Sequence, residues 1–358
     1  VQVPCEFVLE NNTVHFNFPE GYNKGYELVI DPEVVFSASS GSKADNFGHT
    51  CTYDAEGNLY SGGIAFSDGY PIKLAYDPTF NFGGIDVVIT KYNALGTDLV
   101  YSTYLGGNSD EIVTSLIIDN ANNLFLYGVT GSVDFPVTAN AFQKINKRGT
   151  YYDPHPNNGN EFPDGTDLFV ARFSALGNAL VGSTFIGGTG NDGINCNNRN
   201  SAAMPLDSLQ YNYGDYYRGE IDLDKQGNVC VVTSTRSTDF PTKAAIDNTL
   251  GGKQDAIVFK MKNDLSDLVW STYLGGSEND GAYSLILDDA SNVYVTGGTA
   301  SSDFPVTSGV VQNAYKGKVE GYVTKIKADG SSVLASTFWG TSEYDQSFFV
   351  QLDKKNDV

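Results

Sequence analysis

The sequence predicts an all-β fold, a β-propeller of four-stranded antiparallel blades, from three observations. A five-residue turn that opens with Asp recurs about every 65 residues, with one longer interval of about 105, as in a stacked supersecondary repeat. Short β-rich runs flank each turn. Other runs, such as VVI, LFV and AIVF, are apolar on consecutive residues, so both faces of their sheets must be covered. The turns DAEGN, DNANN, DKQGN, DDASN and DKKND begin at Asp54, Asp119, Asp224, Asp288 and Asp353.

Composition fits a globular β protein and excludes some partners. The chain has 358 residues, of which 41% are hydrophobic and 18% charged, and its formal net charge is −21. Nucleic acids and anionic membranes bind basic surfaces, so neither is expected as a partner. No apolar run approaches the roughly 20 residues that a spanning helix needs, so no membrane insertion is expected.

Residues 1–32 lack the repeat and are predicted to be the end of a preceding β-domain or strands docked on the first blade. The string TVHFNF alternates apolar and polar residues, and PEGYNKG is typical of a turn. The chain begins at Val1 rather than Met, so we expect a processed or trimmed N-terminus.

Residues 33–358 are predicted to form the propeller, with four strands in each repeat. Strand A precedes the Asp turn and strand B follows it. Strand C is predicted at 86–92, 167–173, 255–261 and 321–327, and strand D at 101–107, 182–188, 270–276 and 335–341. Sheets stacked face to face around an axis cover both faces, as in a propeller. The alternative, a β-solenoid, has much shorter rungs.

Both ends of the array are predicted to hold blade edges. A spare strand D is predicted at 33–39 and a fifth strand A at 347–352. Seven blades of this size need about 450 residues, so we expect this chain to be a fragment of a longer propeller-bearing protein.

The long interval contains two insertions, near 137–166 and 189–216, which lengthen the B–C and D–A connections by about 16 and 24 residues. Antiparallel strands alternate in direction, so both insertions emerge at the same end of the blades. Long loops on a rigid scaffold commonly bind ligands, and Tyr, Asn and Gly suit glycans or proteins. An alternative is that the insertions merely cover the blade edge. The candidate ligand-binding residues are Tyr151, Tyr152, His155, Tyr211, Tyr213, Tyr216, Tyr217 and Arg218.

Two recurring motifs are interpreted as structural. In the Asp turn, the Asp accepts backbone hydrogen bonds, and Gly or Asn tolerates a positive φ. A calcium loop needs alternating ligands and a distant Glu, a pattern that the nearest string, DLDKQGN, lacks. No cofactor is therefore expected, with calcium as the alternative. In the DFP motif, Pro ends strand B, and the Phe is predicted to fill the seam between blades. Its copies begin at Asp134, Asp239 and Asp303.

A carboxylate follows the end of each strand D. If these acids lie just before the innermost strands, they would form a ring at one mouth of the axial channel. One interpretation is a cation site, and the other is that each Asp caps backbone N–H groups. The residues are Asp110, Asp192, Asp280 and Asp345.

Nothing in the sequence indicates catalysis. The three histidines, His15, His49 and His155, lie in different segments, and neither HExxH nor GxSxG occurs. No carboxylate pair stands out for glycoside hydrolysis.

Disulfide pairing of the four cysteines stays open. A bridge between Cys196 and Cys230 would join opposite ends of the blades, which disfavours it, and Cys5 with Cys51 remains possible.

Three strings recur together: STYLGG, D-x-x-G-N-x-h-h-V-T-G and S-x-D-F-P-V-T. Over residues 26–358 the chain resembles the bacterial seven-bladed β-propeller repeat family (SBBP-type repeats), and ELVIDPEVVFSASSG resembles the segment that leads into such arrays. The resemblance implies a part of a large exported protein in a Bacteroidota context of type IX secretion or gliding motility, and it supplies no catalytic residues. Residues 207–209, Asp-Ser-Leu, also resemble a Bacteroidota O-glycosylation site.

These observations lead to a non-enzymatic, secreted or cell-surface propeller that serves as a binding or adhesion scaffold. Its expected location is the outer cell surface or the medium, after passage through the periplasm. The expected partner is a protein or glycan at the insertion-bearing end, with secretion-system components as further partners. The alternatives are a polysaccharide-active enzyme and a passive spacer or export cargo. The ligand, the total blade number and the oligomeric state are open.

Overall fold

The structure is a computed structural model that describes the chain except residues 1–2, 11–12, 27–35, 154–160, 196–208 and 210–215. The chain divides into two compact units, Val1–Ser37 and Ala38–Val358. The first unit contains an antiparallel hairpin of β1 (Glu6–Glu10) and β2 (Thr13–Asn17). The alternating string that begins at Thr13 thus forms a strand.

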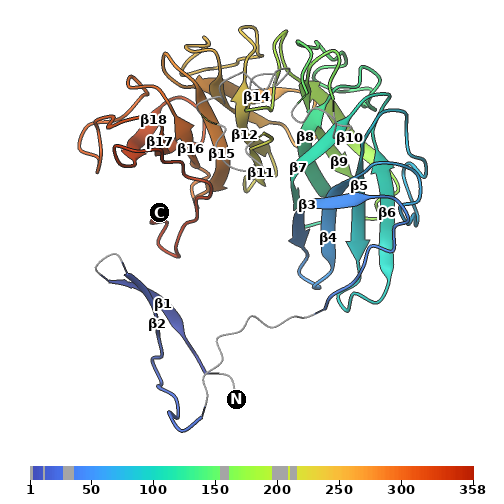
Figure 1. Ribbon diagram of the computed structural model, residues 1–358, viewed down its shortest axis with the longest axis horizontal. Coiled ribbons are helices and arrows are strands. Elements are labelled where there is room, and N and C mark those ends of the chain that lie inside the picture. The colour runs from blue at the N-terminus through green and yellow to red at the C-terminus, as the bar shows by residue number, and fades with distance from the viewer. Residues whose placement is uncertain (1–2, 11–12, 27–35, 154–160, 196–208, 210–215) are drawn as a thin grey trace. The chain divides into compact units, whose positions relative to one another are not determined.

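The second unit contains four sheets of four antiparallel strands, one for each predicted repeat (Figure 1). The all-β fold and its blades are therefore confirmed. The first blade consists of β3 (Asn46–Tyr53), β4 (Leu59–Ala65), β5 (Asp86–Tyr92) and β6 (Leu99–Leu105). The second consists of β7 (Glu111–Ile118), β8 (Leu124–Thr130), β9 (Asp167–Phe173) and β10 (Leu180–Ile186). The third consists of β11 (Glu220–Leu223), β12 (Val229–Thr235), β13 (Asp255–Met261) and β14 (Leu268–Leu274). The fourth consists of β15 (Asp280–Leu287), β16 (Val293–Thr299), β17 (Glu320–Ile326) and β18 (Val333–Trp339).

The blades pack face to face, and each seam, meaning the interface between two consecutive blades, has a hydrophobic core. Strand β12 shows why its sequence is apolar on consecutive residues. Val229 and Val231 belong to the core between the second and third blades, whereas Cys230 and Val232 belong to the core between the third and fourth. Successive side chains point to opposite faces of a strand, so one strand supplies two seams. The strands that begin each blade, β3, β7, β11 and β15, contact one another in sequence.

The Asp turns between strands A and B are built as predicted. In the first copy, Asp54 Oδ1 accepts the N–H of Asn58 over 2.8 Å, and the intervening Gly57 has a φ of +82°. Positive φ is costly for a residue with a Cβ, which favours Gly or Asn here. The other copies place Asn122, Gly227, Ser291 and Asn356 in this conformation.

The Phe of each DFP motif fills a seam, as predicted. Phe135 is 2% exposed, stacks on Phe169 with ring centroids 4.5 Å apart, and belongs to the core between the first and second blades. Phe240 and Phe304 are equally buried in the next two seams. Truncating a buried Phe of this kind to Ala costs about 3–5 kcal/mol.

Neither predicted edge strand is found among the residues that the structure describes. Of the spare strand at 33–39, residues 36–39 are described and contain no strand. Residues 347–352 also form none, because no neighbouring strand offers them a ladder of hydrogen bonds. This segment packs on the fourth blade instead, where Val350 is buried and its N–H donates to Ser284 Oγ over 3.2 Å.

Strand direction gives the blades two distinct ends. The turns between strands A and B and between C and D form one end, here called the Asp-turn end. The B–C and D–A connections form the other, the insertion end, because both insertions extend it. Among the described residues, no helix is long and apolar enough to cross a membrane.

Candidate functional site

At the insertion end, one carboxylate caps each turn that follows strand D. The N–H donors and carboxylate acceptors, with their N···O distances, are Gly107 and Glu111 (3.0 Å), Gly188 and Asp192 (2.9 Å), Gly276 and Asp280 (2.7 Å), and Thr341 and Asp345 (2.7 Å). After the last strand of the first blade this position belongs to Glu111, the first residue of β7, so the prediction that placed Asp110 in the series is corrected. Both acids stand together in the sequence, and only the register of β7 distinguishes them.

Asp110 has a different role at the same seam. Its carboxylate accepts the N–H groups of Gly84 over 2.7 Å, Ile85 over 3.2 Å and Glu161 over 2.8 Å. Glu161 lies in the first insertion, so Asp110 joins the first two blades to that insertion. Burial raises the pKa of Asp110 to about 6, although these hydrogen bonds oppose the shift.

The predicted ring of carboxylates at a channel mouth is not what the structure contains. Asp110, Asp192 and Asp280 are at most 3% exposed, and each is bound to groups inside a seam. The capping interpretation therefore describes these acids, and Asp345 also caps. Among the described residues, no three His, Cys, Asp or Glu side chains are grouped to hold a metal ion.

A second buried acid stands at the start of each strand C and accepts a backbone N–H from the connection before it. The donors and acceptors are Asn81 and Asp86 (2.6 Å), Lys147 and Asp167 (2.8 Å), Gly251 and Asp255 (2.8 Å), and Lys316 and Glu320. Because this residue and the acid after strand D lie in the same seam, the fold collects carboxyls in pairs.

A glycine separates the two acids of each pair. A Cβ on Gly106 would lie 2.6 Å from both Asp86 Oδ1 and Glu111 Oε2. At the next seam, Gly187 stands in the same relation to Asp167 and Asp192. The first Gly of each Gly-Gly step thus leaves room for two carboxyls that a side chain would push apart.

Burial makes these pairs hard to ionise. Burial raises the pKa of Glu111 to about 8 and that of Asp86 to about 7, and the negative charges nearby add to both shifts. It likewise raises the pKa of Asp167, further raised by the charge of Asp192. Near neutral pH the pairs therefore hold protons that a solvated carboxyl has already released.

The Asp-turn end contains ion pairs, which differ in how deeply they are buried. The sequence analysis did not predict them. In each blade a cation near the end of strand C contacts the Asp that opens the turn. The pairs are Lys91–Asp54 (2.9 Å), Arg172–Asp119 (3.4 Å), Lys260–Asp224 (3.2 Å) and Lys325–Asp288 (2.9 Å). Burial opposes ionisation of Asp54, but hydrogen bonds from Asn58 and Lys91 outweigh it and bring its pKa down to about 2. A basic residue at the sixth or fifth position of each strand C run was the available signal.

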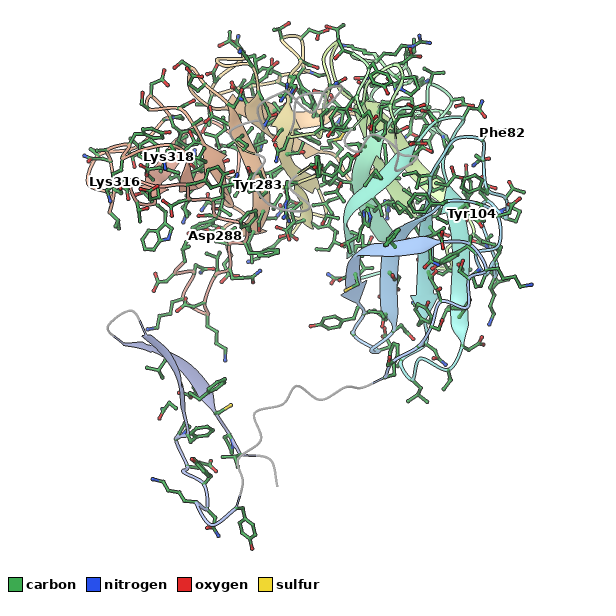
Figure 2. All side chains as sticks on the ribbon, in the orientation of Figure 1. Phe82, Tyr104, Tyr283, Asp288, Lys316 and Lys318 are labelled. Carbon is green, nitrogen blue, oxygen red and sulfur yellow. The ribbon has the colours of Figure 1, made fainter. Side chains whose placement is uncertain are left out.

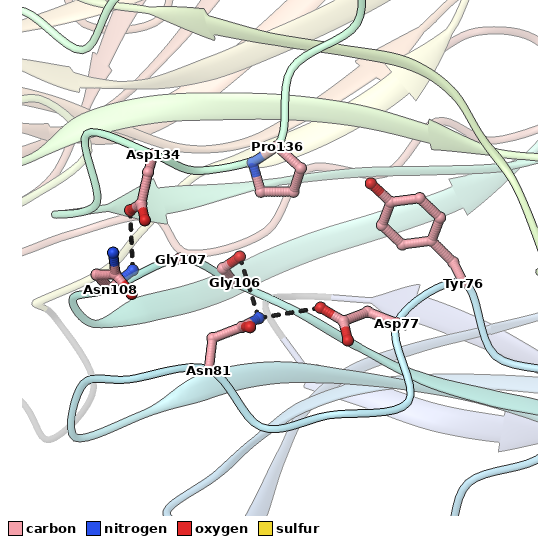
Figure 3. Close-up of a pocket in the computed structure, with 8 residues that line it drawn as sticks. All are labelled: Tyr76, Asp77, Asn81, Gly106, Gly107, Asn108, Asp134 and Pro136. Carbon is pink, nitrogen blue, oxygen red and sulfur yellow. Dashed lines mark hydrogen bonds between the residues drawn. The ribbon is translucent and has the colours of Figure 1, made fainter.

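A cavity of about 340 Å³ opens at the insertion end of the seam between the first and second blades (Figure 3). Tyr76, Asp77 and Asn81 come from the β4–β5 connection, and Asn108 follows β6. Asp134, the first residue of a DFP motif, closes the far side. Its Oδ1 accepts the N–H of Asn108 over 2.9 Å. The sequence analysis did not single out Tyr76, Asp77 or Asn81.

The two insertions meet at their bases. Phe162 in the first and Tyr217 in the second form an edge-to-face contact, with ring centroids 6.3 Å apart. Tyr152 and Phe162 are fully buried, and Tyr216 is 6% exposed, in the core of the seam between the second and third blades. The prediction that Tyr152 and Tyr216 contact a ligand directly is therefore corrected, because both rings are packed in the hydrophobic core.

The remaining candidate binding residues are placed differently. Tyr151 donates its hydroxyl to Glu161 Oε2 over 3.1 Å. The guanidinium of Arg218 lies over the ring of Phe348, 4.9 Å from its centroid, so it ties the second insertion to the C-terminal segment. Tyr217 is half-buried. His155, Tyr211 and Tyr213 lie outside the described residues, as does the 207–208 part of the glycosylation motif.

The described histidine and cysteine side chains form no catalytic arrangement. His49 Nδ1 lies 3.1 Å from the carbonyl oxygen of Val113, and burial lowers the pKa of this imidazole. Cys5, Cys51 and Cys230 are free, and burial raises the pKa of the Cys230 thiol. Cys196 lies outside the described part of the chain.

Comparison with known families agrees with the architecture. Residues 269–305 match the family model described as Beta-propeller repeat, SBBP. Four four-stranded blades and this match define the chain as a β-propeller repeat protein. Residues 1–33 match a second family, described as a domain of unknown function, DUF7948.

Solved structures with distant similarity include three that span most of this chain. A protein of unknown function from Dyadobacter fermentans has 13% identity and a TM-score of 0.41, with 85% of this chain and 71% of that chain covered. A glycoside hydrolase has 12% identity and a TM-score of 0.31, with 83% and 50% covered. The NanB sialidase of Streptococcus pneumoniae has 9% identity and a TM-score of 0.30, with 90% and 66% covered. We infer no function from similarity at this level. No curated protein matches the chain significantly.

Proposed function

We propose that this protein is a non-enzymatic binding or adhesion scaffold that acts outside the cell or at its outer surface. The observation that carries the proposal is the junction of the two insertions. Segments about 50 residues apart in the chain meet through Phe162 and Tyr217 and rest on a buried aromatic base. The described bases of the two insertions are thus held against each other and against the blades, which limits the side-chain entropy that binding there must remove.

Further contacts brace the platform. Thr150, in the first insertion, donates its N–H to Asn191 Oδ1 over 3.0 Å, and Asn191 lies where the second insertion begins. Asn195 donates its N–H to the carbonyl of Tyr216 over 2.9 Å. The buried Asp110, Asp192 and Asp280 at this end accept backbone N–H groups, which supports a structural role for these three acids.

A glycan array probed with the whole chain tests this function, followed by assays for reducing-sugar release on each glycan bound. We expect binding without turnover, and loss of binding in Tyr151→Ala and Tyr217→Ala. Tyr53→Ala is the matched control, because Tyr53 is exposed at the Asp-turn end. Turnover would favour the enzyme alternative, and unchanged binding in both insertion variants would remove the site assignment.

Because a protein ligand would escape a glycan array, surface proteins of the source cells form a second panel. Failure to bind either panel would favour the passive spacer. For the location, we propose export through a type IX secretion system, in a gliding or adhesion context. Proteinase K digestion of intact cells tests it: a surface protein is cleaved without lysis, whereas protection would contradict the location.

A further inference from the structure

The cavity between the first two blades brings together two carboxylates. Asp77 and Asp134 face it from different blades, and the ring of Tyr76 lies on the Asp77 side of the cavity (Figure 3). Asp77 Oδ2 accepts a hydrogen bond from Asn81 Nδ2 over 3.0 Å, and Asn81 Nδ2 also lies 3.3 Å from the carbonyl oxygen of Gly106. Within the described residues, neither Asp77 nor Asp134 has a cationic partner.

Two contacts identify the equivalent positions in the other blades. A strand D threonine donates its hydroxyl to the carbonyl of Asp77, and three other blade positions receive the same bond: Gln143, Asp247 and Gln312. The backbone N–H of Asn81 donates to the acid that opens strand C, as do those of Lys147, Gly251 and Lys316.

The charges at these two positions vary together: a Lys at the second position occurs only where the first position is neutral. Where the first position is Gln, the second is Lys, and its ammonium makes polar contacts at the insertion end. Lys147 Nζ lies 3.5 Å from Oδ2 of Asp239, the equivalent of Asp134. Lys316 Nζ donates to Gln312 Oε1 over 3.1 Å and to a strand-end glycine carbonyl over 3.3 Å. Where the first position is Asp, the second, Asn81 or Gly251, carries no charge.

The first seam therefore presents an extra carboxylate in place of the ammonium that the next seam supplies for itself. The buried groups behind the cavity offer no cation either. Asp86 Oδ1 and Glu111 Oε2 lie behind Gly106, and Asp86 Oδ1 has no hydrogen-bond partner within the described residues. Beside Asn81, Phe82 is 82% exposed and projects from the β4–β5 connection (Figure 2).

We propose that this cavity binds a primary ammonium group brought by another molecule, as Lys147 supplies one within the chain at the next seam. The ammonium lies beside Asp134 Oδ2, as that of Lys147 lies beside Asp239, and Asp77 and Tyr76 face it from the other side of the cavity. An aromatic ring and two carboxylates together favour an organic cation. The exposed Phe82 gives a partner segment an apolar contact next to the cavity, as a lysine on a protein would use. This site is additional to the insertion platform and does not depend on its function.

Nuclear magnetic resonance of the whole chain, labelled on Tyr and Asn, tests the proposal. The probes are a lysine-containing tripeptide with blocked ends, its Nε-acetyl form, the free diamine cadaverine, and calcium chloride. We expect the lysine peptide to shift the signals of Tyr76 and Asn108, and the acetylated peptide to leave them unchanged. Asn81→Lys should weaken binding by at least about tenfold, because it places an internal ammonium in the cavity.

Two variants keep the result clear. Asn81→Gln is the neutral matched control and should bind the peptide as the wild type does. Asp134→Asn keeps an oxygen for the Asn108 N–H and should lose binding without loss of fold. Binding of cadaverine but not of the peptide would support the ammonium site with a free amine as its source. Equal binding by Asn81→Lys, equal shifts with the acetylated peptide, or shifts with calcium alone would overturn the proposal.

Discussion

The two ends of the blades use the same residue type in opposite ways. At the Asp-turn end, Asp224 is held by Lys260 and Asn228, and the hydrogen bonds from Asn228 and Lys260 outweigh burial to lower its pKa. At the insertion end, Asp280 is bound only by neutral donors, and burial raises its pKa to about 7. In this repeat, therefore, the presence or absence of a cationic partner, and not burial alone, decides whether an Asp is ionised.

Removing the cation at the Asp-turn end should give the largest effect. Lys260→Met leaves the buried carboxylate of Asp224 without its ammonium and should lower the free energy of unfolding by about 3–5 kcal/mol. Urea denaturation followed by Trp270 fluorescence measures it, because Trp270 is buried beside Lys260.

The control is Lys262→Met, which removes an exposed partner of Asp267 and should leave stability unchanged within error. Combining Lys260→Met with Asp224→Asn should recover part of the loss. Equal destabilisation by the two lysine variants would mean that burial does not distinguish these ion pairs.

Replacing Asp by Asn should raise the free energy of unfolding at the insertion end and lower it at the Asp-turn end. At pH 8 the buried Asp280 carboxyl is ionised only at an energetic cost, because burial raises its pKa to about 7. Asp280→Asn removes this cost and keeps an oxygen that accepts the Gly276 N–H, so it should stabilise the fold by about 1–2 kcal/mol. Asp224→Asn should destabilise at the same pH. Urea midpoints of both variants at pH 8 check this, and a shared sign would contradict the comparison.

The wild-type protein should lose stability as pH rises. The folded pKa values of Glu111, Asp86 and Asp255 are raised to about 8, about 7 and about 6, above the unfolded values near 4. Between about pH 4 and about pH 8 the folded state therefore binds more protons than the unfolded state, and the free energy of unfolding falls as pH rises through this window.

Denaturation at pH 5 and pH 8 measures that difference, and Asp280→Asn should reduce it. Asp54 has the opposite linkage: its pKa of about 2 contributes stability that is lost only as the pH falls towards 2. A midpoint that is equal at pH 5 and pH 8 would show that the paired carboxyls do not hold their protons.

The smallest effect is expected at an exposed pair. Lys318 Nζ lies 2.6 Å from Glu343 Oε2, but both side chains are mostly exposed, and Lys318 lies at the edge of the fourth blade (Figure 2). Lys318→Ala should change the free energy of unfolding by less than about 0.5 kcal/mol, because solvent screens the pair. A larger loss in the same urea assay would mean that exposed pairs here are not weak.

Much of the fold was predictable because its signals are local. The Asp turn closes within five residues through bonds such as that from Asn58 to Asp54, so its chemistry can be recognised in the sequence. The burial of Phe135 follows from apolar periodicity and the proline after it. The site was less predictable: Tyr152 and Tyr216 resemble surface loop residues in sequence, but they are packed between blades.

The four complete repeats of this chain, the turn chemistry and the location of the insertions could be predicted from the sequence alone, because they depend on neighbours along the chain. The tertiary structure was needed to show that Glu111 rather than Asp110 caps its turn, that Lys147 pairs with Asp239 at one seam, and that an acidic cavity opens at another. Those outcomes depend on strand register and on contacts between residues from different blades. A shift of one residue in β7 would have turned Glu111 to the other face of its sheet.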